Sequence, residues 1–140
     1  MKSWIVTIET LPDIIPELLA DIAPAWVVLL EGAMGSGKTT LVSEICKYLQ
    51  CVDVASSPTY AIINEYEYQQ AGQAQKIYHM DLYRLQSIEE AIDIGIEDYL
   101  EQDQYCFIEW PGIIEPLLPQ TFRKIEIQLT TDFKRKIILL

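Results

Sequence analysis

One glycine-rich segment, Gly32 to Thr39 with the sequence GAMGSGKT, constrains this chain more than any other feature. It matches the pattern G-x-x-x-x-G-K-[ST] at every fixed position. An apolar run from Trp26 to Glu31 precedes it and predicts a strand covered on both faces, and Lys38 to Leu49 follows with the apolar spacing of a helix. Strand, turn and helix therefore follow one another without a spacer, which is the context of a phosphate-binding loop.

The fixed residues of this loop each have a physical role. Glycines let the backbone turn its N–H groups inward and form a nest for phosphate oxygens, and the helix start adds further N–H groups and its positive dipole end. Lys38 is expected to bind the β and γ phosphates, and the Thr39 hydroxyl to coordinate Mg²⁺. Thr40 is expected chiefly to pack or cap. We predict a nucleoside triphosphate site made of Gly32, Ala33, Met34, Gly35, Ser36, Gly37, Lys38, Thr39 and Thr40.

A magnesium ion in such a loop also needs a carboxylate, which phosphate-loop enzymes place at the end of a neighbouring apolar strand. Two predicted strands end in this way: 105–108 before Glu109, and 76–80 before Asp81. Spacing alone does not choose between them. The first run is the more apolar and is favoured as the central strand, so Glu109 is predicted to position the metal. Asp81 is predicted either to support the metal site without binding the ion directly or to orient water. A solvated carboxylate at a strand end is the alternative for each.

Three further features accompany the loop. Ser56 to Thr59 lies between its helix and the next strand, where a hydroxyl could respond to the γ phosphate as in a switch segment; a polar turn is the alternative. His79, the single histidine, is expected to be a structural hydrogen-bonding residue. Trp110 follows Glu109 and is expected either to lie over the site or to pack in the core.

The order of predicted elements indicates the fold class. With 140 residues and no repeat, linker or low-complexity tract, residues 1–140 are expected to form one domain. We predict an α/β, P-loop NTPase-like three-layer fold whose central, mostly parallel sheet is flanked by helices. Besides the elements above, strands are predicted at 3–9 as an edge, 61–68 and 75–80 as a hairpin, 124–129 and 134–140, and helices at 10–23, 87–95 and 96–102.

Composition narrows the classes of function. Ten Lys and Arg residues against 21 Asp and Glu residues give a net charge of −11. A chain of this charge repels the phosphate backbone of a nucleic acid, so binding of nucleic acid by this chain alone is disfavoured. The three cysteines are odd in number and form no C-x-x-C pair, so neither a disulfide framework nor a zinc site is predicted. With no signal peptide or membrane-length apolar run, a cytoplasmic location without membrane contact is expected.

Several motifs together resemble the TsaE (YjeE) family, the bacterial ATPase for threonylcarbamoyladenosine modification of tRNA. They are the loop end Gly37 to Thr40, Ser57-Pro58-Thr59, His79-x-Asp81-Leu82-Tyr83-Arg84 and Glu109-Trp110-Pro111, in the family's order and at about its separations. In one departure, Ala33 and Met34 stand where the family commonly has Asp-Leu. That change removes a carboxylate from the loop but leaves the phosphate nest intact.

The resemblance implies a cytoplasmic enzyme that hydrolyses Mg-ATP weakly alone and works with the TsaB–TsaD pair, which would hold most of the tRNA. Carried over by motif, Lys38 binds phosphate, Thr39 and Glu109 position Mg²⁺, Thr59 belongs to the switch, and Asp81 is needed for hydrolysis. Five of the ten basic residues fall in the last strands and are expected either to contact tRNA or a partner or to be solvated, namely Arg123, Lys124, Lys134, Arg135 and Lys136.

Other readings of the loop stay open. A small-molecule kinase is the first alternative, although Arg84 is the only arginine between Lys38 and Arg123 that could serve a lid. A GTPase is disfavoured because the only asparagine, Asn64, is not followed by a guanine-reading motif. A third alternative is a docking module controlled by ATP occupancy with little turnover. An arginine that assists hydrolysis could be Arg84 or come from a partner.

Overall fold

The computed structural model describes residues 1–53 and 62–140. In chain order its elements are β1 (Lys2–Val6), α1 (Leu11–Ile22), β2 (Val27–Glu31), α2 (Lys38–Tyr48), β3 (Val52–Asp53), β4 (Ile63–Gln70), β5 (Gln73–Asp81), α3 (Ile88–Asp93), α4 (Ile96–Leu100), β6 (Tyr105–Glu109), the 3-10 helix η1 (Pro111–Leu117), β7 (Phe122–Leu129) and β8 (Arg135–Leu139).

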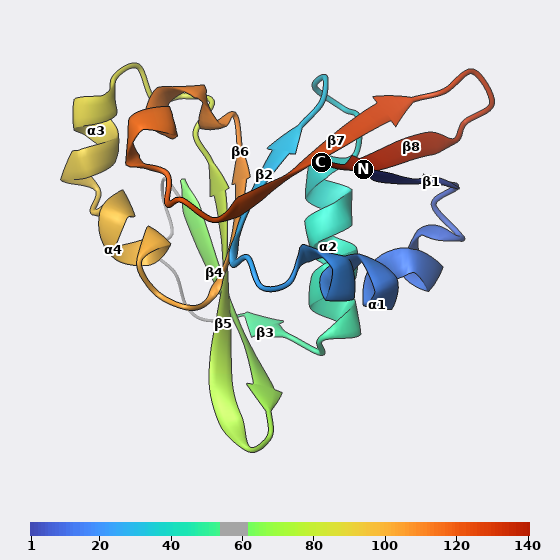
Figure 1. Ribbon diagram of the computed structural model, residues 1–140, viewed down its shortest axis with the longest axis horizontal. Helices are drawn as coiled ribbons and strands as arrows, with labels where there is room; N and C mark the ends of the chain where they lie inside the picture. Colours follow the sequence, from blue (N-terminus) through green and yellow to red (C-terminus); the bar gives the residue numbers. More distant parts are fainter. Residues whose placement is uncertain (54–61) are drawn as a thin grey trace.

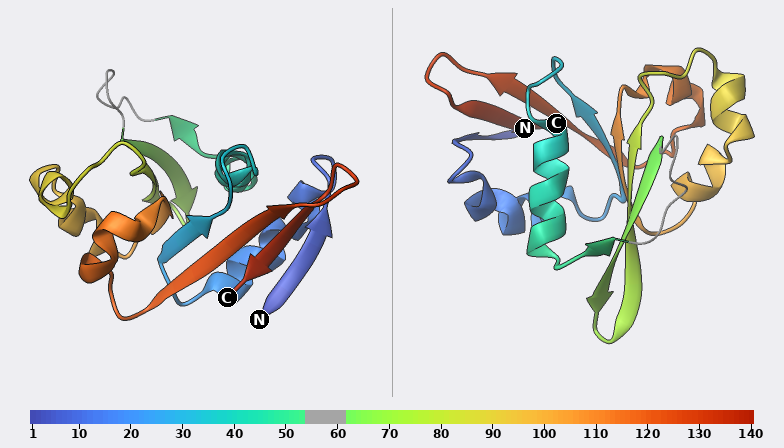
Figure 2. Two further views of the ribbon diagram at one scale, coloured as in Figure 1. Left: turned by 90° about the horizontal axis from the view of Figure 1, so that it is seen from above. Right: turned by 180° about the vertical axis from the view of Figure 1, so that it is seen from behind.

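The strands of the described residues form one eight-stranded sheet in the order β1-β8-β7-β2-β6-β5-β4-β3. The four central strands β7, β2, β6 and β5 are parallel, and the outer strands pair antiparallel. Helices α1 and α2 cover one face, and α3, α4 and η1 lie on the other side (Figures 1 and 2). The predicted α/β three-layer fold with a mostly parallel central sheet is confirmed.

Strand β2 shows why its apolar run belongs at the centre of the sheet. Side chains alternate between the faces of a strand. Val28 and Leu30 accordingly join the core under α1 and α2, whereas Val27 and Leu29 join the core under α3, α4 and η1. With no polar side chain before Glu31, the strand is covered on both faces, as its composition predicts.

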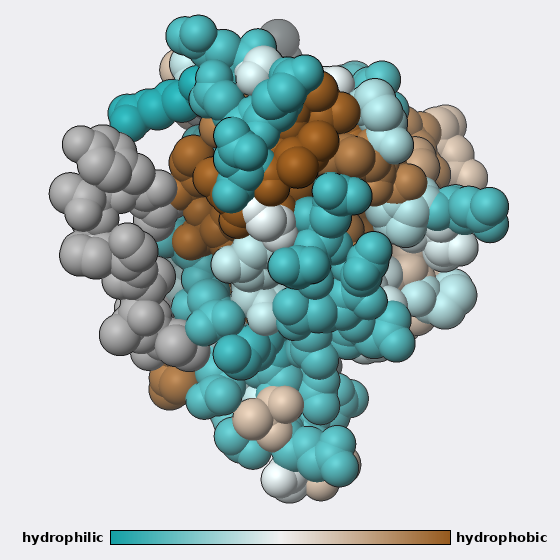
Figure 3. Space-filling model, turned by 90° about the vertical axis from the view of Figure 1, so that its left-hand side faces the viewer, coloured by the Kyte–Doolittle hydropathy of each residue, from teal (hydrophilic) through white to brown (hydrophobic). Residues whose placement is uncertain are grey.

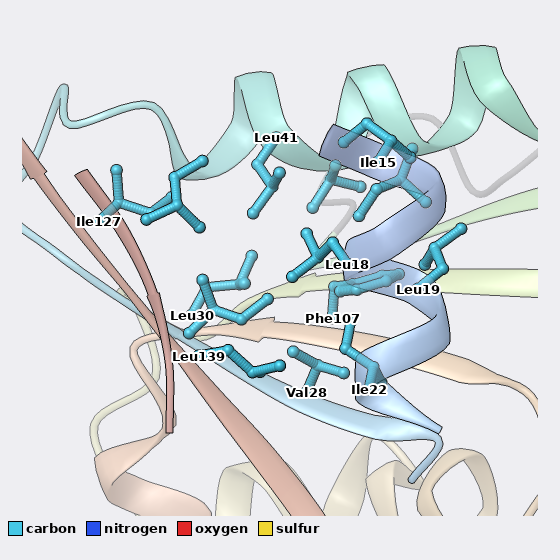
Figure 4. Close-up of a cluster of buried hydrophobic side chains, with 14 of the residues drawn as sticks. Ile15, Leu18, Leu19, Ile22, Val28, Leu30, Leu41, Phe107, Ile127 and Leu139 are labelled. Atoms are coloured by element: carbon cyan, nitrogen blue, oxygen red, sulfur yellow. The ribbon is translucent and has the colours of Figure 1, made fainter. Parts of the chain in front are cut away.

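The first core gathers side chains from both helices and from the sheet (Figure 4). Ile15, Leu18 and Ile22 of α1 are fully buried and follow the 3–4-residue spacing of one helix face. Leu41 of α2 and Phe107 of β6 complete the same cluster. Because Val28 and Leu30 of β2 belong to this core, the packing fixes where the segment after β2 emerges at the edge of the sheet.

The other side of the sheet carries the shorter helices. The Ser87 side chain caps α3 by accepting a hydrogen bond from the Glu90 N–H at 3.3 Å, at the position where a helix is predicted to begin. Figure 3 shows a hydrophobic area on the side of the molecule where α3 and α4 lie. The exposed hydrophobic residues of this region include Ile92 in α3 and Ile94 directly after it.

The outer strands of the sheet agree with the strands predicted from the sequence, and the structure adds two short elements that were not predicted. β4 and β5 form the predicted hairpin across Gly72 and extend away from the helices (Figure 1). β1 is the predicted edge strand and pairs with β8, so that Lys2 lies opposite Leu139 and the termini are neighbours. The two-residue strand β3 and the 3-10 helix η1 were not predicted. None of the described helices is both long and apolar enough to cross a bilayer.

Candidate active site

The glycine-rich segment lies at the carboxyl end of β2, between the ends of β7 and β6, and leads into the first turn of α2. Two glycines are required by its geometry. A Cβ on Gly32 would lie 2.5 Å from Ser36 Oγ and 2.7 Å from the Ile127 carbonyl oxygen. Gly37, directly before α2, has φ of 111°, which an L side chain rarely adopts. The loop can therefore turn sharply from strand to helix.

A cavity of about 390 Å³ opens beside this loop. Its walls come from the loop and α2, from the ends of β5 and β6, and from β8; they are Met34, Gly35, Gly37, Lys38, Thr39, Thr40, Asp81, Tyr83, Glu109, Trp110 and Arg135. Gly32 instead lines an adjoining cavity of about 450 Å³. Ala33 and Ser36 line neither; the Ser36 N–H donates to the Ala33 carbonyl at 3.0 Å, and the Ser36 side chain is buried.

Lys38 is held against the loop at the border of the two cavities. The residue is only 5% exposed, and Nζ donates a hydrogen bond to the Gly32 carbonyl oxygen at 2.8 Å. The same Nζ lies 4.1 Å from the centre of the Trp110 ring, within the range of a cation–π contact. A buried ammonium with a neutral acceptor and an aromatic face leaves this position strongly attractive to anions.

Glu109 ends β6 and joins three elements at the floor of the site. Its Oε2 accepts a hydrogen bond from the Thr39 hydroxyl at 3.1 Å and lies 2.5 Å from His79 Nε2 on β5. Burial alone would raise the pKa of the Glu109 carboxyl, but His79, the Thr39 hydrogen bond and the Lys38 charge outweigh it and hold the pKa below its ordinary value of 4.5. Glu109 is therefore an ionised carboxylate fixed beside the first turn of α2. His79 is the structural hydrogen-bonding residue expected.

Asp81 lies next to Glu109 because β5 and β6 are parallel and pair these two residues in register. Unlike Glu109, Asp81 is exposed, and its Oδ1 accepts a hydrogen bond from the Tyr83 N–H at 3.1 Å. β6 lies between β2 and β5, so the preference for Glu109 as the carboxylate on the more central strand agrees with the sheet order. Both carboxylates face one cavity with Lys38 and Thr39.

Trp110 is placed over the loop and not in the core. Its backbone is left-handed, with φ of 57° and ψ of 59°, which is uncommon for a bulky residue and directs the indole toward Lys38. The residue is 37% exposed, and its ring lies 5.2 Å from the Tyr83 ring, centre to centre. Of the two expectations for Trp110, the structure agrees with a position over the site.

Comparison with known proteins bears directly on this geometry. The family model described as Threonylcarbamoyl adenosine biosynthesis protein TsaE matches residues 7–137. The chain belongs to the TsaE family. Its loop, its two strand-end carboxylates and Trp110 all lie within the matched residues, and the resemblance drawn from the sequence motifs is confirmed. The family is one of tRNA threonylcarbamoyladenosine biosynthesis.

Relatives and a solved structure agree with this family. The chain is 36% identical over 114 residues to the tRNA threonylcarbamoyladenosine biosynthesis protein TsaE of Bacillus subtilis, covering 81% of this chain and 68% of the relative. It is 39% identical over 118 residues to the Rickettsia bellii protein of the same name, covering 83% and 78%. The crystal structure of Bacillus subtilis YdiB superposes with a TM-score of 0.69 and 30% identity, covering 97% of this chain and 82% of that one.

Arg135 was not predicted for the site, although it lines the cavity of this TsaE family member. Its Nε donates a hydrogen bond to the Ser36 carbonyl at 2.8 Å. Arg84, the arginine considered from the sequence, is exposed and absent from the cavity wall. The strand order would have indicated that Arg135 lies near the loop. β7 is parallel to β2, so the following antiparallel strand β8 begins at the edge of the sheet where the loop lies.

Other basic residues of the last strands are also engaged within the chain. Arg123 Nη1 donates to the Asp21 carbonyl at 2.6 Å, and Lys124 Nζ lies 3.2 Å from Glu31 Oε1. With Arg135, three of the five basic residues in these strands thus have partners in the chain. The predicted switch residue Thr59 lies outside the described residues.

The oxygen atoms at this TsaE site are of the kind that bind a hard cation such as Mg²⁺ together with a substrate. Within 1–53 and 62–140, no group of three or more His, Cys, Asp and Glu side chains could hold a metal ion. Mg²⁺ in nucleotide sites does not need such a cage, because it is bound by one or two carboxylates together with phosphates and water. The Thr39 hydroxyl and Glu109 carboxylate, joined at 3.1 Å, provide oxygen donors of the required kind.

Proposed function

We propose that this chain, acting as one domain over residues 1–140, is an ATPase that hydrolyses Mg-ATP for threonylcarbamoyladenosine modification of tRNA. One observation carries the proposal. A buried lysine, a hydroxyl at the start of α2 and two strand-end carboxylates line the same cavity in a member of the TsaE family; they are Lys38, Thr39, Glu109 and Asp81.

Lys38 and the loop backbone would bind the phosphates. The Lys38 ammonium already lies at the loop, and a phosphate oxygen would be a stronger acceptor for it than the neutral Gly32 carbonyl. Because Lys38 is buried and Trp110 covers it, its charge acts in a medium of lower dielectric than water. Met34, Gly35, Gly37 and Thr40 add to the cavity wall.

Thr39 and Glu109 would hold Mg²⁺, which when bound neutralises charge on the phosphate oxygens. His79 keeps the Glu109 carboxylate in place through the 2.5 Å contact, so that the ligand does not have to reorganise. Asp81 is exposed at the neighbouring strand end and would orient the attacking water. Thr59 would respond to the γ phosphate.

A role with TsaB and TsaD is the second part of the proposal. The net charge of −11 supports tRNA being held mainly by these partners. The hydrophobic area around α3, with Ile92 and Ile94 exposed, supports contact with another protein (Figure 3). Hydrolysis would be weak in the isolated chain and faster with the partner pair.

The test is reconstitution. TsaB, TsaD and this chain are combined with tRNA, ATP and a preformed, activated threonylcarbamoyl donor. Modified adenosine is measured by mass spectrometry, and phosphate release is measured with and without the pair. We expect modification that requires this chain and phosphate release stimulated by the pair. Failure to modify tRNA, where an established family member succeeds, would contradict the pathway assignment. Modification without phosphate release would favour the docking module, and phosphate transfer to a metabolite would favour the kinase.

A further inference from the structure

Arg135, the first residue of β8, contacts the phosphate loop from a strand that is about a hundred residues later in the chain. Its Nε donates to the Ser36 carbonyl at 2.8 Å, across a sequence separation of 99 residues. It is paired on both sides in the sheet, with Leu129 of β7 and Val6 of β1. The backbone that carries this guanidinium is therefore fixed between two strands.

The guanidinium occupies the space that a side chain at Gly37 would need. A Cβ on Gly37 would lie 2.7 Å from Arg135 Nε and 3.1 Å from its Cδ. The Ser36–Gly37 peptide thus packs directly against the Arg135 side chain. In a trans peptide the C=O and the following N–H point in opposite directions. Anchoring the Ser36 carbonyl on Arg135 consequently sets the direction of the Gly37 N–H, which is one of the amides that the loop pattern offers to phosphate.

The charge balance of the cavity gives Arg135 a second effect. The ionisable groups of the wall include two carboxylates, Asp81 and Glu109, and two cations, Lys38 and Arg135. Without Arg135, one lysine would face both carboxylates and an incoming polyphosphate. Guanidinium has five N–H donors, and among the described residues only its Nε has an acceptor. The remaining donors suit bidentate binding of phosphate oxygens.

We infer that Arg135 positions the Ser36–Gly37 peptide of the phosphate loop and is a second cationic contact for the polyphosphate of the bound nucleotide. This inference rests on the proposed nucleotide site and extends it to β8. It also separates Arg135 from Arg84, which is exposed and lies outside the cavity wall. Arg135 thereby has a role different from the nucleic-acid or partner contact considered for the basic C-terminal strands.

The test uses three variants of the full chain: Arg135→Gln, Arg135→Lys and the matched control Lys136→Gln. Lys136 is the next residue of β8, and its side chain projects to the opposite face because side chains alternate along a strand. Arg135→Gln and Lys136→Gln remove the same charge. Calorimetric titrations with Mg-ATP and with inorganic triphosphate measure affinity, and the latter isolates phosphate contacts from those to base and ribose.

We expect Arg135→Gln to weaken the binding of both ligands by roughly tenfold or more, as for loss of a charge-assisted contact. Arg135→Lys should bind with intermediate affinity, since it keeps the charge but loses the planar Nε donor. Lys136→Gln should stay within about twofold of the unmodified protein. The amide resonance of Gly37 in nuclear magnetic resonance spectra without ligand should shift in both Arg135 variants and not in Lys136→Gln, which a loss of charge alone would not produce.

Two results would overturn the inference. One is triphosphate affinity in Arg135→Gln equal to that of the unmodified protein; the other is an equal loss in Lys136→Gln, which would indicate only a general effect of charge. If Arg135→Gln does not fold, Arg135→Lys decides through its affinity and its Gly37 resonance. Failure of the unmodified chain to bind ATP would instead contradict the proposed function, so the two failures are distinguishable.

Discussion

Thr39 and Glu109 are joined by a hydrogen bond of 3.1 Å from the hydroxyl to Oε2, although 70 residues separate them in the sequence. The contact connects the first turn of α2, directly after the phosphate loop, to the end of β6. His79 from β5 contacts the same oxygen. Residues of α2, β5 and β6 thus meet at one carboxylate beside the loop.

Glu109→Gln is expected to keep nucleotide binding and lose hydrolysis. Glutamine retains the size of the side chain but removes the negative charge that suits a divalent cation. Partner-stimulated phosphate release should fall by about 100-fold or more, while ATP affinity measured without magnesium should change little. Glu101→Gln removes an exposed carboxylate outside the cavity and is the control. Normal phosphate release in Glu109→Gln would contradict the metal-positioning role.

Asp81→Asn is expected to separate water orientation from local folding. Asparagine can still accept the hydrogen bond from the Tyr83 N–H, so the turn after β5 should persist. Because Asp81 is exposed, the free energy of unfolding should change by less than about 0.5 kcal/mol, yet phosphate release should be lost. Chemical denaturation and a phosphate-release assay measure the two effects, with the exposed Asp93→Asn as control. Unchanged release would remove Asp81 from the proposed chemistry.

The stability of the fold should depend on pH through Glu109. Its pKa in the folded protein lies below the ordinary value of 4.5, mainly because the contact with His79 outweighs burial. A lowered folded pKa means that ionised Glu109 stabilises the fold fully above its unfolded pKa, and that this stabilisation is lost as the pH falls through the folded pKa.

Denaturant unfolding of the unmodified protein and of Glu109→Gln checks this sign. The difference in their free energies of unfolding should be constant from about pH 7 to about pH 6 and shrink below about pH 5. A difference that grows on acidification would show that the Glu109 pKa is raised in the folded protein.

Cys106 should be unreactive in the folded protein. Burial raises the pKa of its thiol to about 12, and Sγ donates to the Tyr99 carbonyl at 3.4 Å. Alkylation requires an exposed thiolate. Iodoacetamide at pH 8 followed by peptide mass spectrometry should therefore label Cys106 only when denaturant is present. Rapid labelling of Cys106 in native protein would contradict its place in the core beneath α4.

The sequence predicts that the loop and the two strand-end carboxylates lie close together, for physical reasons. β2, the loop and α2 are contiguous, so local patterns suffice for Gly32 to Thr39. Asp81 and Glu109 each follow an apolar strand, and parallel strands that carry a site end at the same edge of the sheet. Their positions in one cavity could therefore be anticipated without knowing the whole topology.

Arg135 and the conformation of Trp110 could not be anticipated in the same way. β7 and β8 come last in the chain, but β7 lies beside β2, and only this strand order brings Arg135 to the loop. Trp110 has a left-handed backbone before Pro111, which residue preferences do not favour and which only the surrounding structure can impose. Both are consequences of long-range packing.

Titration of Mg-ATP into the unmodified chain and into Lys38→Ala tests the phosphate site most directly. Lys47→Ala is the matched control, because Lys47 belongs to the same helix and is exposed. We expect the unmodified chain and Lys47→Ala to bind ATP within about twofold of each other and Lys38→Ala to bind roughly 100-fold more weakly or not measurably. Unchanged ATP affinity and hydrolysis in Lys38→Ala would contradict nucleotide binding by the loop.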